Sequence, residues 1–139
     1  MDDNWAVHIQ RINPEGLHVT PGYHHVTVVE AGRLAFLAGQ CPVRPDGTYP
    51  PAGDLQGQLD QTVANCLAVL AAVEADPSDV VRSTVYVVSD SQRELAQVWT
   101  LLVESALGPA FSTASTLLGV TQLGYSGQRI EIELTAALA

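Results

Sequence analysis

Val80-Val81-Arg82-Ser83-Thr84-Val85-Tyr86-Val87-Val88 is the stretch that organises this chain. Most of its residues are β-branched or aromatic, and such runs are typical of a central, largely buried strand. One helical pattern precedes the stretch and another follows it. The sequence therefore predicts a strand over 80–88 between two helices that pack on the same sheet.

The two helical patterns have recognisable starts and stops. Asp54 is placed to cap the first helix, and Pro77 is expected to end it. The second helix opens with Ser91-Gln92-Arg93-Glu94, which has the form of a capping box, and Gly108-Pro109 is expected to stop it. The apolar stripes are Leu55, Leu59, Val63, Leu67 and Leu70 in the first helix and Leu95, Val98, Trp99, Leu102 and Ala106 in the second.

Further strands are expected on both sides of this unit. Two short β-prone runs flank Gly32 and predict a hairpin whose turn is residues 30–33. The closing strand alternates Ile and Glu, so its apolar side chains share one face. The expected strands are 9–12 (the weakest), 26–29, 34–37, 116–120 and 129–134.

The element order is thus β-β-β-α-β-α-β-β, which predicts an α+β protein. Two helices on one face of a six-stranded mixed sheet leave the other face without cover. Outward positions of strand 80–88 are still apolar. An uncovered apolar sheet face usually marks an interface, so a homo-oligomer is expected.

The length of 139 residues fits one domain, 1–139, whose N-terminal segment 1–17 holds at most one edge strand. No apolar run approaches the roughly 20 residues that a membrane span needs. The acidic start Met1-Asp2-Asp3-Asn4 does not resemble a secretory signal. A cytoplasmic location is the expectation.

The net charge of −9, with only six Lys plus Arg, disfavours partners that are polyanions. Nucleic-acid binding depends on cations that neutralise phosphates, and anionic membranes attract basic segments. Cys41 and Cys66 lie in no CxxC or Cys/His zinc spacing, so no metal is expected, and nothing calls for a cofactor.

Several local strings, in order and spacing, resemble the YjgF/RidA (reactive intermediate deaminase) family. The resemblance spans roughly residues 18–136. It rests on Tyr23, Ala38-Gly39-Gln40, Pro42-x-x-Pro45-Asp46-Gly47, the helix residues Gln58, Gln61, Thr62 and Asn65, and Arg129-Ile130-Glu131-Ile132-Glu133. It implies a chorismate-mutase-like fold and a homotrimer with three clefts between subunits, each a site for a small polar metabolite.

In the deaminating branch of the family, an Arg grips the substrate carboxylate and a Glu on the last strand orients the attacking water. Glu131 matches that Glu. Alignment on Gly119-Val120 places Ser115 where the Arg is expected, and Ser cannot supply its bidentate cationic clamp. Trp99 and Ala38 replace a polar Asn and Ser. These departures predict a more apolar pocket and make 2-aminoacrylate-type imines poor candidates.

The candidate catalytic residues are Glu131 and His25. A carboxylate beside apolar walls can act as acid or base, and His titrates near neutrality. The alternative for Glu131 is a solvated carboxylate, and for His25 a hydrogen-bonded residue at a strand end. The candidate substrate-binding residues are Tyr23, Gln40, Cys41, Trp99, Ser115 and Thr116; core packing or ordinary turn structure are their alternatives.

Two functions from different classes follow. The first is an enzyme that hydrolyses, or performs acid/base chemistry on, an imine, enamine or carbonyl metabolite. The second is a metabolite-binding or chaperone-like trimer without chemistry, which the missing arginine favours. A ribonuclease is disfavoured by the charge of −9.

Overall fold

The computed structural model describes residues 8–30 and 32–139. Residues 1–7 of the predicted N-terminal segment and Ala31 of the predicted turn lie outside the described part. The element order matches the one expected from the sequence. The elements are β1 (His8–Ile12), β2 (Val26–Glu30), β3 (Arg33–Phe36), α1 (Leu55–Ala72), β4 (Val80–Val88), α2 (Gln92–Glu104), β5 (Ala114–Val120) and β6 (Ile130–Leu138), with short 3-10 turns η1 (Pro77–Asp79) and η2 (Gly108–Phe111).

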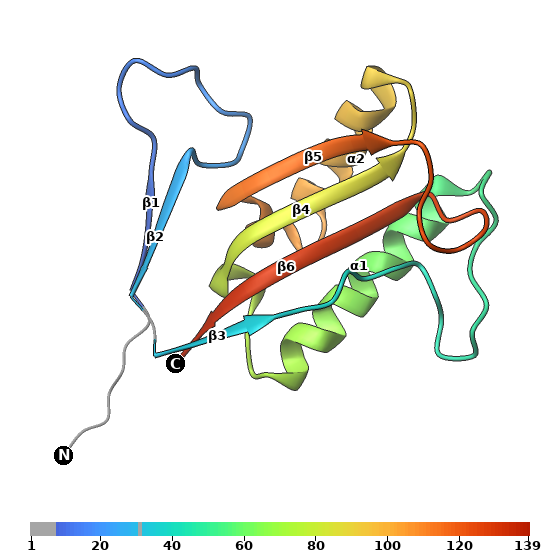
Figure 1. Cartoon of the computed structure of the whole chain (residues 1–139), viewed down its shortest axis with the longest axis horizontal. Coiled ribbons are helices and arrows are strands. Elements are labelled where there is room, and N and C mark those ends of the chain that lie inside the picture. The colour runs from blue at the N-terminus through green and yellow to red at the C-terminus, as the bar shows by residue number, and fades with distance from the viewer. Residues whose placement is uncertain (1–7, 31) are drawn as a thin grey trace.

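The six strands form two sheets in the described chain rather than the single one expected. β1 and β2 pair antiparallel as a separate ribbon, and the main sheet has the order β3-β6-β4-β5 (Figure 1). β4 and β5 are parallel, whereas β6 runs antiparallel to both of its neighbours. β4 is therefore a central, largely buried strand, as its composition predicts.

The predicted hairpin between 26–29 and 34–37 is wrong. The first of these strands pairs with β1, and the second pairs with β6, with Phe36 opposite Thr135. A period-two pattern states which face of a strand is apolar, but it does not name the strand beside it. Adjacency in the sequence was therefore a poor guide to pairing here.

Both predicted helix caps are confirmed, but both predicted stops are misplaced. The Asp54 carboxylate accepts from the Gly57 amide at 2.9 Å, and the Ser91 hydroxyl accepts from the Glu94 amide at 3.2 Å. α1 ends at Ala72, before Glu74 adopts a left-handed φ of 58°. Pro77 instead opens η1, since proline suits a first-turn position where no amide donor is needed. α2 ends at Glu104, and Gly108-Pro109 belong to η2.

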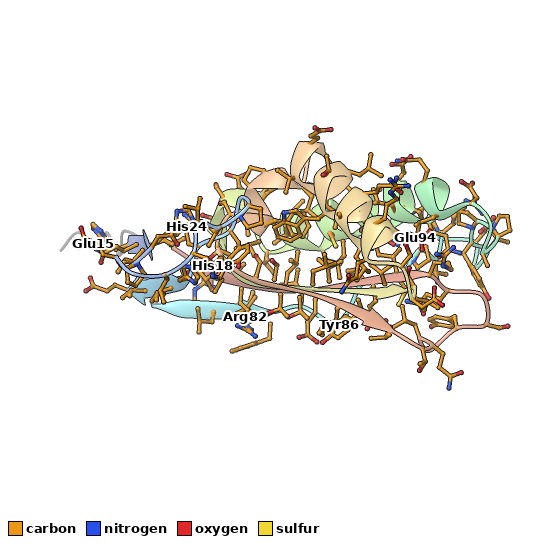
Figure 2. All side chains as sticks on the ribbon, turned by 90° about the horizontal axis from the view of Figure 1, so that it is seen from above. Glu15, His18, His24, Arg82, Tyr86 and Glu94 are labelled. Atoms are coloured by element: carbon orange, nitrogen blue, oxygen red, sulfur yellow. The ribbon has the colours of Figure 1, made fainter. Side chains whose placement is uncertain are left out.

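The core lies between the two helices and one face of the main sheet. Figure 2 shows both helices above the sheet, with Arg82 and Tyr86 projecting below it. We call these two faces the helix side and the open face. Phe36 and Leu118 are 79% and 42% exposed on the open face, which confirms that this face lacks cover in the described chain. The largest fully buried side chains include Leu59, Leu70, Leu102, Phe111, Val85 and Ile132.

Neither α1 nor α2 combines the length and the hydrophobicity that crossing a membrane would require, and no other described helix does.

Candidate functional site

Glu131 lies half-buried on the open face, in β6. It stands opposite Tyr86 in the ladder with β4, and Tyr86 stands opposite Leu118 in β5. Paired residues project to the same face of a sheet. The Glu131 carboxylate therefore lies in line with an aromatic and an aliphatic side chain across three neighbouring strands. An acid/base role for Glu131 was expected to need such apolar neighbours.

Two hydrogen-bond donors converge on one oxygen of this carboxylate. Oε1 of Glu131 accepts from the Cys41 thiol at 3.1 Å and from Nε2 of Gln128 at 3.2 Å. Gln128 is itself 3% exposed and anchored, since its amide also donates to the Ile130 carbonyl and accepts from the Tyr125 amide. The position of Oε1 is thus set by groups that are held in place.

The second oxygen, Oε2, faces Gly39. A β-carbon at position 39 would lie 2.6 Å from Oε2 and 2.9 Å from the carboxyl carbon, which is closer than real contacts allow. Only glycine at this position lets the carboxylate pack this closely against the backbone. We call Gly39, Cys41, Gln128 and Glu131 the carboxylate site.

The segment that carries Gly39 and Cys41 is tied to β6 by an isolated antiparallel bridge. Gln40 donates its amide to the Ile132 carbonyl at 2.7 Å, and the Ile132 amide donates back at 3.0 Å. The Asn65 side chain on α1 donates to the carbonyls of Cys41 and Val43. Backbone pairing and a helix anchor therefore bring the thiol to Glu131. The Gln40 side chain turns back to the Ala38 carbonyl at 3.0 Å.

The Cys41 thiol is a donor at neutral pH. Burial, followed by the hydrogen bond and the negative charge of Glu131, raises the pKa of Cys41 from 9.0 to about 11. The thiolate is the nucleophilic form, so a thiol that keeps its proton is a poor nucleophile. Burial likewise raises the pKa of Cys66 to about 12. Within the described residues, no group of three His, Cys, Asp or Glu side chains has a metal-binding arrangement.

His25 lies in a separate aromatic cluster. Its Nε2 is 3.0 Å from the His18 carbonyl oxygen, its amide donates to Asn13, and its ring packs edge-on against His18. The hydroxyl of Tyr23 in turn contacts His18 Nε2 at 2.9 Å. Within the described part of the chain, no hydrogen bond or ring contact joins His25 to Glu131.

The distance between the two follows from the strand register. The His24 amide donates to the Thr113 carbonyl, beside the Ala114–Arg82 pair, whereas Glu131 lies opposite Tyr86. The step along β4 from Arg82 to Tyr86 is about 13 Å at ~3.3 Å per residue. One chain therefore does not bring the two predicted catalytic residues together.

Tyr23, Trp99 and Ser115 meet in a different cavity, on the helix side. It has a volume of about 490 Å³. The rings of Tyr23 and Trp99 lie 6.3 Å apart edge-on, and Trp99 Nε1 donates to the Pro21 carbonyl at 2.8 Å. We call this cavity the helix-side pocket. Its lining residues are Pro21, Tyr23, Gln92, Leu95, Ala96, Trp99, Thr100, Ser115 and Leu117.

Ser115 and Thr116 face opposite ways. The Ser115 hydroxyl lies 2.5 Å from that of the fully buried Ser83 and also donates to the Phe111 carbonyl, so it points to the helix side. Thr116 stands opposite Thr84, whose ladder partner on β6 is Glu133, so it shares the open face with Glu131. The position aligned with the family's Arg thus lies on the face away from Glu131.

Sequence reasoning did not single out Gly39 and Gln128 as site residues. A glycine inside an otherwise β-prone run is a known sign of close approach, so Gly39 carried a usable signal. Gln128 carried none, because its three-residue separation from Glu131 becomes meaningful only once the preceding turn folds back.

The fold and this site define a small α+β protein with a half-buried carboxylate on an uncovered sheet face. Residues 17–138 match the family model described as Endoribonuclease L-PSP, and the chain belongs to this family, the YjgF/RidA family. The crystal structure of YyfB, of the conserved Rid protein family of Yersinia pestis, is similar: its TM-score is 0.84 at 33% identity, over 94% of this chain and 98% of YyfB. YEO7 of yeast, at 23% identity over 94% and 98% of the two chains and a TM-score of 0.65, shares the fold.

Curated relatives match over a shorter stretch. Protein DfrA of Myxococcus xanthus is 39% identical over 64 residues, which are 46% of this chain and 49% of DfrA. A RutC family protein of Pyrococcus horikoshii is 36% identical over 58 residues, 42% of this chain and 46% of the relative. The matched stretch is therefore about half as long as these relatives.

Proposed function

We propose that this protein hydrolyses a small imine, or the imine form of an enamine, at the carboxylate site. One observation carries the proposal: Oε1 of Glu131 is held by Cys41 and Gln128, while Oε2 has no hydrogen-bond partner among the described residues and is not one of their solvent-excluded polar atoms. A carboxylate with one anchored and one accessible oxygen is suited to hold and deprotonate a water molecule.

The proposed reaction has a simple balance. A water on Oε2 gives a proton to Glu131 as its oxygen attacks the imine carbon, which forms a C–O bond. Glu131 passes this proton to the nitrogen, which gives a neutral carbinolamine. Glu131 then takes the hydroxyl proton as the C=O bond forms and gives it to the departing nitrogen as the C–N bond breaks, so one imine and one water yield one carbonyl compound and one molecule of ammonia or amine.

The surroundings of Glu131 favour a substrate with little negative charge. Its row neighbours are Tyr86 and Leu118. Arg82 also projects from the open face, but it lies four positions along β4 from Tyr86, about 13 Å away. A cation at that distance does not grip the carboxylate of a small molecule bound at Glu131. We therefore favour neutral or weakly anionic imines, with an aromatic or aliphatic substituent, over amino-acid-derived imines.

The proposed active form is a homotrimer in the cytoplasm. Exposed Phe36 and Leu118 on the open face supply apolar surface for self-association. His25 and Tyr23 are too far from Glu131 in their own chain to act on it, so any role for them at that site requires a loop from a second copy.

The test is ammonia release from imines that an amine oxidase or amino-acid oxidase generates in the assay. The protein should accelerate release over the spontaneous rate, and Glu131→Gln should lower that acceleration at least about 100-fold with an unchanged fold. Glu133→Gln, on the same strand and exposed, is the matched control and should retain activity. Full activity of Glu131→Gln on every imine tested would reject the mechanism.

A second candidate function is binding without turnover, and the helix-side pocket is the observation that favours it. Its volume is typical of small-molecule sites, and its wall is mainly apolar. Titration of small aromatic compounds while following tryptophan fluorescence, with Trp99→Phe as control, measures such binding. Saturable quenching that is lost in the variant, together with no imine hydrolysis, would favour this function over the first.

The endoribonuclease activity in the family description is not proposed for this chain. Its net charge is −9, and Arg11, Arg33, Arg44 and Arg129 already donate hydrogen bonds within the chain. A measured RNA affinity that falls steeply with added salt would contradict this exclusion of RNA as a substrate.

A further inference from the structure

We propose that Cys41 is a positioning residue, which fixes the orientation of the Glu131 carboxylate so that one oxygen is anchored and the other is presented to the reacting water. The inference rests on the proposed function for its catalytic consequence, but the Cys41–Glu131 contact can be tested without any substrate. The thiol would act as a fixed hydrogen-bond donor and not as a nucleophile.

The geometry supports a fixed donor rather than a chance contact. The Gln40–Ile132 bridge pairs both amides and carbonyls, and in an antiparallel ladder this puts the next residues, Cys41 and Glu131, opposite each other. Asn65 on α1 holds the Cys41 carbonyl at 2.8 Å. The 3.1 Å thiol–carboxylate contact therefore joins two anchored backbones.

The two donors on Oε1 approach from different elements. Cys41 comes from the segment after β3, and Gln128 comes from the turn before β6. With both in place, rotation of the carboxylate about its last bond would break two hydrogen bonds. With the thiol removed, only Gln128 resists that rotation, and the plane of the carboxylate can turn away from the orientation that presents its second oxygen.

The chemistry of the thiol matches this role. The titratable group that acts on Cys41 is Glu131 on β6, and Cys41 in turn helps to raise the pKa of Cys66 on α1. Burial and the adjacent carboxylate raise the pKa of Cys41 to about 11, so the donor proton is present throughout the neutral range. Glu131 should consequently protect Cys41 from alkylation, and this protection is a measurable sign of the contact.

The first experiment measures iodoacetamide alkylation of Cys41 from pH 7 to 10.5, with the modified cysteine assigned by mass spectrometry. In the wild type the rate should still be rising at pH 10.5. In Glu131→Gln it should level off earlier and be between about two- and tenfold higher at pH 8, because loss of the negative charge favours the thiolate.

Glu133→Gln is the matched control for charge on the same strand and should behave as the wild type. A change in access alone would alter the maximal rate but not the pH at which the rate levels off. If Glu131→Gln and Glu133→Gln give the same pH dependence, the Cys41–Glu131 contact is absent and the inference fails.

The second experiment compares Cys41→Val, which removes the donor, with Cys41→Ser, which keeps one. Cys41→Val should lower kcat about tenfold at unchanged KM, the size expected for one lost hydrogen bond, and Cys41→Ser should restore most of the rate. Full activity of Cys41→Val beside an inactive Glu131→Gln would overturn the inference and leave the proposed function standing. Full activity of Glu131→Gln would reject the proposed function. The alkylation experiment by itself would then show whether Cys41 contacts Glu131.

Discussion

Gly39 and the carboxylate of Glu131 fit together so closely that position 39 has no room for a β-carbon, which would lie 2.6 Å from Oε2. The two residues are far apart in the sequence and meet because the Gln40–Ile132 bridge aligns their segments. The atom that a side chain at 39 would meet is the end of a flexible side chain and not backbone. The chain can therefore tolerate a substitution there only by moving the carboxylate.

Gly39→Ala should consequently fold but displace Glu131. We expect imine hydrolysis to fall at least about tenfold, while the thermal unfolding midpoint changes little. The matched control is Gly53→Ala, whose added β-carbon would meet no atom within 4 Å. Equal activity of the two variants would show that the placement of Oε2 does not matter.

Stability should fall in alkaline solution through the cysteines. The pKa of Cys41 rises from 9.0 to about 11 on folding, mainly through burial and then through Glu131. Above about pH 9 the unfolded chain loses this proton while the folded chain keeps it. A rise in pH therefore stabilises the unfolded state relative to the folded state. The stability linked to Cys41 is therefore complete below about pH 9 and is lost as the pH rises to about 11.

Urea unfolding midpoints at pH 7.5, 9 and 10.5 measure this dependence. The wild type should lose more stability between pH 9 and 10.5 than Cys41→Ser, in which only the buried Cys66 still contributes. An identical loss in both proteins would contradict the expected link.

Gln58 should stabilise the loop and the turn that lie next to the carboxylate site. It is fully buried on α1, and its amide donates to the carbonyls of Pro50 and Gly127 and accepts from the Arg129 amide. Gln58→Leu keeps the volume but leaves these backbone groups without partners, which should cost about 3 kcal/mol of unfolding free energy. Gln56→Leu is the control, since Gln56 is exposed and its side chain bonds only to Asp60 among the described residues. Chemical denaturation of both variants gives their free energies of unfolding. The difference shows whether the loop at Pro50 and the turn at Gly127 depend on Gln58.

Phe36→Asp should weaken self-association. Phe36 is the most exposed large apolar residue of the main sheet, on the open face opposite Thr135. A buried charge in an interface is costly, so the variant should sediment as a smaller species than the wild type. Val19→Asp, at an exposed loop position, is the control and should leave the association state unchanged. A monomeric wild type in analytical ultracentrifugation would contradict the proposed homotrimer.

Much of the fold was predictable because its signals are local. The β-branched run of β4, the apolar stripes of the two helices and the caps at Asp54 and Ser91 all act within a few residues of chain. The pairing of β2 and β3 was not predictable in this way. Each strand offers the same alternating pattern to any neighbour, so the choice depends on the packing of the whole chain.

The candidate site, like the fold, was predictable from the sequence only in part. Residue types and the family resemblance were sufficient to select Glu131 and Cys41 as candidates, because a carboxylate and a thiol are recognisable wherever they occur. Only the folded chain decided that these two touch, that Gln128 joins them, that Ser115 faces the helices, and that His25 lies elsewhere. Hydrogen bonds act over about 3 Å, and such distances between remote segments arise from strand register and side-chain packing, which local sequence does not encode.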